Sequence, residues 1–530
     1  MLELNPATGP AIQAQDFGDF LLLRLADGMA SSISTIGRVI FESKLDFVDE
    51  VIVTEVEICL AVNESFSRER LRELELLDFS SAETAETVTH ELPIHFADDF
   101  PDWDRIRSHT DLERNTYIER LLQCDFQVAM AGFLPGFVYL SGLPKELQVP
   151  RKENPANRTL PNTFAVGGKY AGVYSLPSAA GWNCIGQIAK QILDPDRVPP
   201  LLLGQGDSVR LIRCDLSEFE SQCRENKTGS QQLACDSPRG DRGTLRFEKP
   251  GMLTLIQDRG RFGFAYYAIP RGGAFDAKSA DVANAIVGNS EDSAVIECHF
   301  VAPTIHFDSD ATICLAGADM QWRVDGQAVR RNQTIQISAG STLSGSKAIS
   351  GCRGYIAIHG TIETSQSFGS SSCYLPGKFG GNEGRPFSVG DVLQWTRPTN
   401  ATFPIRVDVL SSESDDSIPL QPGPEFGWLD EASKQRLLSG EFSIDVNSDR
   451  MGARLNGPKL NARQPQLPDS VPLLPGMIQL TPSGQCIVVL QDGQTTGGYP
   501  RVGYLNPMAI SRLNQTPIGH PFCFEMTDSD

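Results

Sequence analysis

The sequence predicts a mainly β protein with some α+β character, divided into three or four domains. Its 530 residues are too many for a single hydrophobic core. Short apolar runs rich in β-branched residues recur along the chain, and 48 glycines and 34 prolines are spread between them. This spacing is typical of many short strands joined by turns.

Composition indicates an ordinary soluble globular protein, with 40% hydrophobic and 21% charged residues. A formal net charge of −20 argues against nucleic acid or an anionic membrane as a partner. Residues 1–16 lack the features of a signal peptide, and no apolar run approaches the ~20 residues that span a bilayer. The 12 cysteines show no metal-binding spacing. We therefore expect a cytoplasmic protein with free thiols and no metal site.

The first 95 residues predict a small, ferredoxin-like α/β domain. Helical patterns alternate with strand-like runs, and the run 90–96 is expected to close the unit. The expected helices span 31–43 and 67–77, and the expected strands span 20–25, 51–53 and 58–62.

Residues 96–224 begin with one more helical stretch and then become all-β. The run 132–140 predicts a strand interrupted by Pro135-Gly136, which implies an edge or a bulge with aromatic rings beside it. Two interpretations remain open: these are barrel strands with corner glycines, or they line a shallow cleft. The cleft would be formed by Phe133, Phe137, Tyr139 and Trp182, with Arg151 as a charge clamp.

A repeated pattern divides the rest of the chain. A Gly-Asp turn followed by an alternating strand occurs at 204–212 and 388–395, and more loosely at 517–524. Each copy is followed by a polar stretch or by the last residues, so each is expected to close a barrel-like domain. The predicted units are a β domain over 96–224, a linker over 225–243, and two β-barrel domains over 244–398 and 399–530.

The loop over 490–500 is the strongest candidate for a site. It follows a predicted buried strand and places Asp492, Gln494, Thr495 and Thr496 ahead of Gly497-Gly498-Tyr499. Glycines let backbone N–H groups approach a ligand closely. The alternative is a tight polar turn whose side chains cap only its own backbone.

Further polar loops lie in the second half. Gln257, Asp258 and Arg261 lie in a charged, glycine-containing loop that matches neither a dinucleotide fingerprint nor a Walker motif. Asp276 precedes a predicted helix over 277–287, where a carboxylate either caps the helix or takes part in chemistry.

Arg450 and Arg454 are spaced four apart. On a helical turn they would share a face and could hold a carboxylate or phosphate, or they could pair with Asp449 or Asp445. Nucleophile-elbow, HExxH and kinase motifs are absent from the sequence.

Several stretches match motifs of two related families. In the first half these are Gly132–Leu140, Pro150-Arg151, Gly172–Tyr174 and Gly181–Asn183; in the second half they include Gln257–Arg261, Asp276, Ile296-Glu297, Gly380-Gly381, Ser448–Gly452 and Asp492–Pro500. The first half resembles the B component of bacterial ATP-dependent 5-oxoprolinase, also described as allophanate hydrolase subunit 1 and as a sporulation-kinase inhibitor. The second half resembles the C component, the allophanate hydrolase subunit 2 or biotin-dependent carboxyltransferase-like family. Both families also occur joined in urea carboxylase of the urea amidolyase-related group.

The resemblance implies cyclophilin-like β-barrel domains and a fused B–C component of a 5-oxoprolinase-type hydrolase. Such an enzyme would open 5-oxo-L-proline, a small cyclic amide, to L-glutamate, using ATP in an oligomeric complex with a separate protein like the A component. Within that hypothesis, Asp492, Asp276 and Thr495 are the candidate catalytic residues. The candidate substrate-binding residues are Arg450, Arg454, Gln494, Thr496, Gly497, Gly498, Tyr499, Gln257, Asp258, Arg261, Phe133, Phe137, Tyr139, Arg151 and Trp182.

Two alternatives remain open. A carboxyltransferase acting on a urea-like amide would need carboxybiotin from another chain, because no Ala-Met-Lys-Met biotin acceptor occurs here and no biotin is expected on this chain. A non-catalytic pair that regulates a kinase is the other alternative. It is favoured by departures from the B-family pattern, where Leu121 replaces a histidine and Ala179-Ala180 replaces Pro-Gly.

Overall fold

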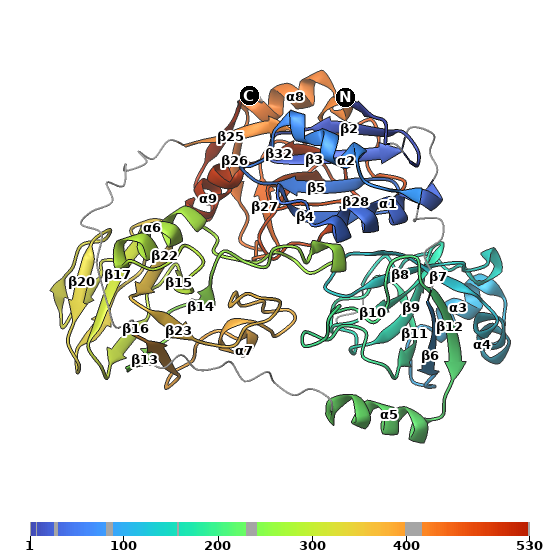
Figure 1. Ribbon diagram of the computed structural model, residues 1–530, viewed down its shortest axis with the longest axis horizontal. Helices are drawn as coiled ribbons and strands as arrows, with labels where there is room; N and C mark the ends of the chain where they lie inside the picture. The colour runs from blue at the N-terminus through green and yellow to red at the C-terminus, as the bar shows by residue number, and fades with distance from the viewer. Residues whose placement is uncertain are drawn as a thin grey trace.

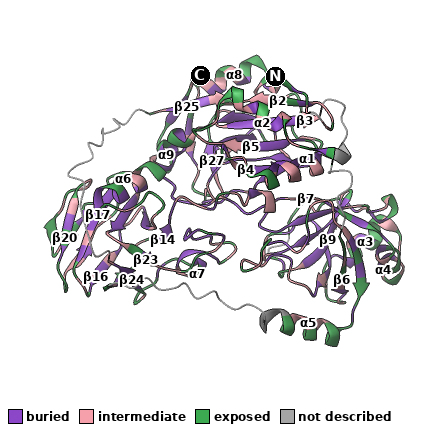
Figure 2. Cartoon of the chain, in the orientation of Figure 1, coloured by how far each residue is buried: buried purple, intermediate pink, exposed green. Residues whose placement is uncertain are grey.

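The computed structural model describes residues 2–6, 8–25, 30–80, 88–155, 158–228, 241–397 and 416–527. Most of the predicted linker over 225–243, and the predicted boundary between 398 and 399, lie outside these residues. Figure 1 shows four packed units, and Figure 2 shows that their strands are mostly buried. Among the described residues, no helix has the length and apolar character needed to cross a membrane.

The N-terminal unit is an antiparallel sheet in the order β1-β2-β3-β5-β4. Its elements are β1 (Leu2–Leu4), β2 (Ile12–Asp16), β3 (Phe20–Leu25), α1 (Ala30–Ser43), β4 (Val48–Val53), β5 (Ile58–Val62), the 3₁₀ turn η1 (Arg68–Arg70) and α2 (Leu71–Glu75). Side chains alternate along β3, so Leu21 and Leu23 share a core with Ile36 of α1, whereas Phe20 and Leu22 face the C-terminal barrel. The small α/β domain predicted here is confirmed.

The first barrel is closed in the order β10-β8-β7-β12-β6-β11-β9. Its strands are β6 (Thr89–His95), β7 (Phe126–Ala131), β8 (Val138–Ser141), β9 (Thr163–Gly167), β10 (Tyr170–Tyr174), β11 (Asn183–Ile188) and β12 (Ser208–Arg213), with α3 (Trp103–Thr110), α4 (Arg114–Leu122), the turn η3 (Lys145–Leu147) and α5 (Leu216–Thr228). The run 90–96 was expected to close the preceding α/β domain. Instead, β6 pairs with β11 and β12, so the barrel begins before residue 95.

The unit over 244–398 was predicted to be a β-barrel, and this is wrong. It consists of two sheets, in the orders β19-β18-β21-β16-β13-β24-β23 and β14-β15-β22-β17-β20, whose facing side chains form one core. The strands are β13 (Arg242–Lys249), β14 (Leu253–Gln257), β15 (Val295–His299), β16 (Thr304–Phe307), β17 (Ala311–Asp319), β18 (Arg323–Val324), β19 (Gln327–Ala328), β20 (Thr334–Ile337), β21 (Thr342–Ser344), β22 (Ser350–Ile358), β23 (Thr361–Glu363) and β24 (Val392–Thr396), with the turn η4 (Ala265–Tyr267), α6 (Ala277–Val287) and α7 (Gly381–Gly384). We call this unit the sandwich.

The C-terminal unit is a closed barrel, as predicted, in the order β25-β32-β29-β30-β27-β26-β33. It contains β25 (Ser417–Pro422), the turn η5 (Phe426–Trp428), α8 (Glu431–Ser439), β26 (Glu441–Ile444), β27 (Gly452–Asn456), β29 (Met477–Leu480), β30 (Cys486–Val489), β32 (Arg501–Tyr504), α9 (Pro507–Gln515) and β33 (Phe522–Met526). A small accessory ribbon pairs β28 (Val471–Pro472) with β31 (Thr496–Gly497).

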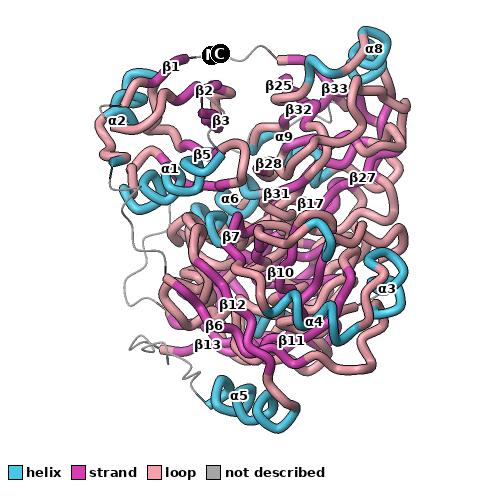
Figure 3. The backbone as a smooth tube through the Cα atoms, turned by 90° about the vertical axis from the view of Figure 1, so that its right-hand side faces the viewer, coloured by secondary structure: helices cyan, strands magenta, loops and turns pink. Residues whose placement is uncertain are grey.

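The N-terminal sheet packs against the C-terminal barrel although the two are far apart in sequence, as Figures 1 and 3 show. Arg501 crosses this contact fully buried: it reaches Glu57 at 2.6 Å and holds Glu425 with two hydrogen bonds of 2.9 Å. In Figure 1 the long connection from β14 to α6 runs from the sandwich to the first barrel and back. In this connection the Tyr267 carbonyl accepts from the Gly136 N–H of the first barrel at 3.3 Å, and the Ala265 N–H donates to Glu50 of the N-terminal sheet at 3.0 Å. The Gly272 N–H donates to the Gln491 carbonyl of the C-terminal unit at 2.9 Å, so this connection contacts all three other units.

Candidate functional site

The loop over 490–500 lies where the C-terminal barrel meets the first barrel. The Phe133 backbone N–H donates to the Thr496 hydroxyl at 3.1 Å, across 363 residues of sequence. A Cβ at Gly132 would overlap that hydroxyl, so glycine permits the close approach. Phe133 itself has a φ of 68°, a left-handed conformation that is strained for a bulky residue.

The side chains of this loop differ in exposure. Thr495, Thr496 and Gly497 are buried, whereas Gln494, Gly498 and Tyr499 are half-buried at its edge. The Leu473 N–H donates to the Thr495 carbonyl at 2.7 Å. The Thr495 hydroxyl is buried and has no hydrogen-bond partner among the described residues. The alternative of a turn that caps only its own backbone is therefore not what the structure contains.

Asp492 and Arg450 form a buried ion pair between the loop and the start of β27. Arg450 donates from Nε to Asp492 Oδ2 at 2.8 Å and from Nη2 to Oδ1 at 3.3 Å. The same guanidinium donates to Glu297 Oε1 at 2.6 Å and to the Gly273 carbonyl at 2.7 Å. These four hydrogen bonds commit Arg450 to the junction between the barrel and the sandwich, so it has little capacity left for a substrate.

Glu297 is the buried acceptor on the sandwich side of that junction. It also accepts from Tyr355 Oη at 2.9 Å and from the Phe275 N–H at 2.7 Å, and His299 Nε2 lies 2.8 Å from its other oxygen. Burial would raise the pKa of Glu297, but Arg450 and His299 together lower it to about 2. Burial raises the pKa of Asp492, and Arg450 offsets only part of that rise.

Gln257 and Asp258 organise a neighbouring loop. Asp258 accepts from the Ser370 hydroxyl at 2.7 Å and from the Ser371 N–H at 2.6 Å. Gln257 accepts from the Ser372 hydroxyl and donates to the Cys373 carbonyl at 3.3 Å. Because their polar groups are hydrogen-bonded to residues 370–373, both side chains hold that segment in place instead of facing a ligand.

Arg261 follows these residues and is also buried. Its Nη2 donates to the Ser372 carbonyl, and the guanidinium lies 4.8 Å from the Phe379 ring centroid. Burial lowers the pKa of Arg261, while the charges of Asp492 and Asp258 oppose the shift.

Two predicted residues of the second half have other roles. Asp276 caps α6, accepting from the Ser279 N–H at 3.1 Å and from its hydroxyl at 2.6 Å, and it also holds Gln515 at 2.8 Å. Arg454 is exposed on strand β27, so the prediction that it shares a helical face with Arg450 is wrong. A strand reverses side-chain direction at each residue, and Arg450 precedes that strand in a turn.

The aromatic cleft predicted in the first barrel is a packed cluster. Residues 132–137 form the connection between β7 and β8 instead of a strand. Phe137, Tyr139 and Trp182 are buried, and Trp182 lies 5.4 Å edge-on from both other rings. Phe133 is half-buried at the border, and exposed Arg151 lies 5.5 Å from the Trp182 ring centroid. The structure therefore favours the barrel interpretation over the cleft interpretation for Phe137, Tyr139 and Trp182.

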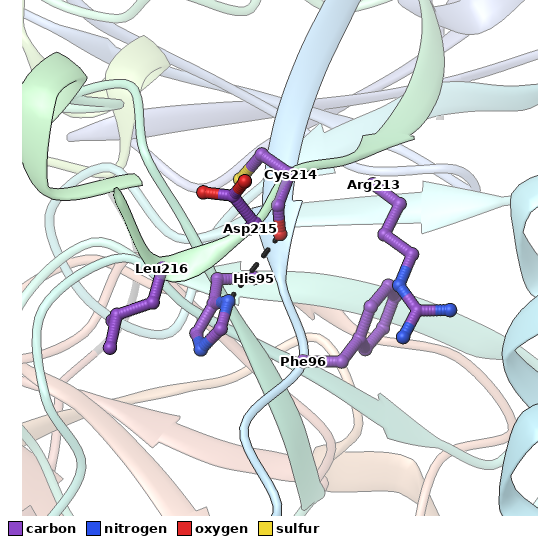
Figure 4. A pocket seen from close by; sticks show the side chains of 6 residues that line it. All are labelled: His95, Phe96, Arg213, Cys214, Asp215 and Leu216. Atoms are coloured by element: carbon purple, nitrogen blue, oxygen red, sulfur yellow. Dashed lines mark hydrogen bonds between the residues drawn. The ribbon is translucent and has the colours of Figure 1, made fainter. Parts of the chain in front are cut away.

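A hollow of about 430 Å³ lies in the first barrel, where β6 and β12 end and α5 begins (Figure 4). Its lining residues are His95, Phe96, Arg213, Cys214, Asp215 and Leu216. His95 Nδ1 lies 3.4 Å from the Cys214 carbonyl. Asp215 accepts hydrogen bonds from the Ser217 hydroxyl and the Glu218 N–H in the first turn of α5. None of the predicted site residues lines this hollow. In the described part of the chain, no group of His, Cys, Asp or Glu side chains is arranged to hold a metal ion.

Sequence reasoning missed Glu297 and Tyr355 as partners of the predicted residues. A signal was available, since Glu297 interrupts the apolar run Val295–His299, and a glutamate is rarely buried without a partner. Ser372 stands out in the sequence only as part of a glycine-serine turn, and its contact with the loop at 257–261 depends on tertiary structure.

Comparison with known proteins agrees with the arrangement of two halves. Residues 267–526 match the family model of the carboxyltransferase domain, subdomains A and B, and residues 21–203 match that of subdomains C and D. The C component of 5-oxoprolinase from Escherichia coli K12 is 33% identical over 280 residues, which are 53% of this chain and 90% of that protein. The B component of 5-oxoprolinase from Escherichia coli O157:H7 is 36% identical over 112 residues, which are 21% of this chain and 51% of that protein.

The urea amidolyase of Saccharomyces cerevisiae is 33% identical over 223 residues, 40% of this chain but only 12% of that protein. Among solved structures, the protein TTHA0988 is similar with a TM-score of 0.81 and 26% identity, covering 96% of this chain and all of the other. The Kluyveromyces lactis urea carboxylase shares the fold, with a TM-score of 0.50 and 20% identity, over 73% of this chain and 37% of that one.

Proposed function

The chain belongs to the carboxyltransferase-domain family, as a fusion of parts like the B and C components of 5-oxoprolinase, and we propose that it opens 5-oxo-L-proline to L-glutamate. In this proposal it acts with a separate protein like the A component and consumes ATP in the assembled complex. Related proteins are named as enzyme subunits, which supports membership of an enzyme complex.

The contact between Phe133 and Thr496 carries the proposal. It joins the Gly132–Leu140 motif of the first half to the Asp492–Pro500 motif of the second half through one hydrogen bond of 3.1 Å. The strained φ of Phe133 is maintained at this contact, and backbone strain concentrates at functional sites. This contact supports a site to which both halves contribute.

Hydrolysis of the lactam is uphill, so the reaction must be coupled to ATP. ATP would supply a phosphoryl group to the amide oxygen, which makes the carbonyl carbon more electrophilic. Attack of water on that carbon, breakage of the carbon–nitrogen bond and protonation of the ring nitrogen would leave the phosphoryl group on the new carboxyl group. A second water molecule would then release inorganic phosphate and glutamate.

Asp492 is the proposed acceptor of the water proton, because burial raises its pKa and Arg450 fixes its orientation. The Thr495 hydroxyl, which has no hydrogen-bond partner among the described residues, is the proposed donor to the negatively charged phosphoryl oxygens on the activated amide.

Glutamate release from 5-oxoproline, measured with the purified chain, a protein like the A component and ATP, tests the proposal. We expect no turnover without the partner or without ATP. Asp492→Asn should lower kcat about 10²- to 10⁴-fold, and Asp308→Asn, a surface carboxylate paired with Arg246, serves as the matched control. Unchanged turnover by Asp492→Asn would exclude the assigned role and favour a non-catalytic regulatory pair.

Transfer of a carboxyl group to a urea-like amide is the second candidate. It is favoured by the two carboxyltransferase family models and by the similarity to urea amidolyase. Carboxybiotin would have to come from another chain. Incubation with a biotin carboxylase, a biotinylated carrier, bicarbonate and urea would yield carboxylated urea if this candidate is correct, and 5-oxoproline would then remain unconverted.

A further inference from the structure

Arg261 is a buried cation whose hydrogen-bonding capacity is largely unused. Its side chain is only 1% exposed, yet Nε and Nη1 have no hydrogen-bond partner among the described residues. An arginine carries five N–H donors, and here the Ser372 carbonyl takes one of them through Nη2. Burying unpaired donors of a charged group is costly, so such a group requires an explanation.

The neighbouring carboxylates do not satisfy these donors. Asp492 receives both of its ion-pair hydrogen bonds from Arg450. Asp258 accepts from Ser370, from the Ser371 N–H and from the Gly260 N–H at 2.8 Å. Both charges act on Arg261 through space without taking up its Nε or Nη1 hydrogens.

The geometry of the guanidinium leaves one complete edge unused by the described residues. The two hydrogens of Nη2 lie on different edges, one shared with Nε and the other with Nη1. Because the Ser372 carbonyl accepts only one of them, the other edge keeps two parallel donors. Two parallel N–H groups match the two oxygens of a carboxylate.

Glycine backbone surrounds the guanidinium. A Cβ at Gly272 would come within 2.6 Å of Nη1, and one at Gly380 within 2.8 Å of Nη2. Both glycines have positive φ, of +67° and +84°. Larger residues at these positions would press on the guanidinium, so glycine at both positions lets the backbone approach it closely.

The loop that holds Arg261 also reaches the first barrel. Ser372 and Phe379 lie against the guanidinium, while Phe368, Tyr374 and Phe379 belong to the hydrophobic core of the first barrel. Arg261 thus lies between the sandwich and the first barrel, and its charge acts on Asp492, which lies in the same loop as Thr496.

We propose that Arg261 binds a carboxylate of the substrate, and that the substrate class is therefore small amides carrying a carboxylate. This inference rests on the proposed function, in which Asp492 serves the reacting amide. Neutral amides such as urea would leave Arg261 unpaired. The carboxylate of 5-oxoproline, attached beside the ring nitrogen, would pair with it.

Binding to the full chain can be measured by calorimetry with 5-oxoproline, 2-pyrrolidinone, glutarate and urea. The lactam 2-pyrrolidinone differs from 5-oxoproline only in lacking the carboxylate. We expect 5-oxoproline to bind roughly 100-fold more tightly than 2-pyrrolidinone. Arg261→Gln should abolish this difference, whereas Arg246→Gln, a surface control, should preserve it. Arg261→Lys keeps the charge without the paired donors and should retain part of the difference; it also serves if the glutamine variant fails to fold.

The outcomes separate this inference from the proposed function. If the complex converts 5-oxoproline and Arg261→Gln or Arg261→Lys changes neither KM nor the preference over 2-pyrrolidinone, Arg261 is not the carboxylate site although the function holds. If glutarate binds in an Arg261-dependent way but 5-oxoproline is neither bound nor converted, the site holds and the substrate is another carboxylate. Binding of 2-pyrrolidinone or urea as tight as that of both carboxylates would overturn the inference, as would no binding of either carboxylate.

Discussion

Replacement of Arg450 by methionine should strongly destabilise the C-terminal half of the protein. Arg450 makes four hydrogen bonds to Asp492, Glu297 and Gly273, and both carboxylates are fully buried. Methionine fills a similar volume but leaves two buried charges without this partner. Breaking a buried ion pair from one side costs about 3–5 kcal/mol.

The effect can be measured by differential scanning calorimetry of the full chain. For a unit of this size, 1 kcal/mol corresponds to about 2–4 °C, so the expected loss is roughly 10 °C in the transition of the C-terminal half. Arg454→Met is the matched control, because Arg454 is exposed, and it should shift the transition by less than about 1 °C.

A double variant distinguishes two causes of the lost stability: the loss of charge pairing and the loss of side-chain packing at position 450. Adding Glu297→Gln to Arg450→Met removes one of the stranded charges and should recover part of the loss. A transition unchanged by Arg450→Met would refute the view that this network holds the barrel to the sandwich. A double variant less stable than the single one would indicate that packing, not charge, dominates.

Three further changes test other contacts. Gly132→Ala places a methyl group against the Thr496 hydroxyl and should lower both stability and turnover, and Thr496→Ala in the same chain should relieve the clash; equal losses in the single and double variants would contradict the close approach. Burial raises the pKa of Glu50 to about 8, so the folded state holds a proton that the unfolded state releases near pH 4.5. Stability should therefore fall between pH 4.5 and pH 8, and Glu50→Gln should flatten that slope in thermal melts; parallel curves would argue against it. Asp276→Ala removes the cap of α6 and should cost about 1 kcal/mol in denaturant unfolding without changing kcat, and a large fall in kcat would restore Asp276 as a catalytic candidate.

The sequence predicted those parts of the fold that depend on local pattern. The apolar run ahead of Leu490 is the buried strand β30, and the apolar run 20–25 is the strand β3. The first and last barrels were also predicted. The run 90–96 was assigned to the wrong unit because its pattern shows that it is a strand but not which strands it pairs with. Whether a sheet closes into a barrel likewise depends on which distant strands pair. The sequence pattern over 244–398 does not specify that pairing, so the predicted barrel was wrong there.

The candidate site was predicted in part. The loop with Asp492 and Thr495 was identified from its glycines and its preceding strand, and Arg450 was identified as an anion partner. That its anions are Asp492 and Glu297 of this chain depends on contacts across 42 and 153 residues. Phe137 and Trp182 were expected to line a cleft, but aromatic side chains pack with one another when the fold brings them together.

Hydrogen exchange in the assembled complex, with and without 5-oxoproline, tests most directly whether both halves form one site. Peptides covering 132–137 and 492–500 should become protected together, because the Phe133 N–H and the Thr495–Tyr499 loop meet at the same contact. Asp492→Asn should retain this pattern if binding precedes chemistry. Protection confined to one half of the chain, or absent from both, would contradict a shared site.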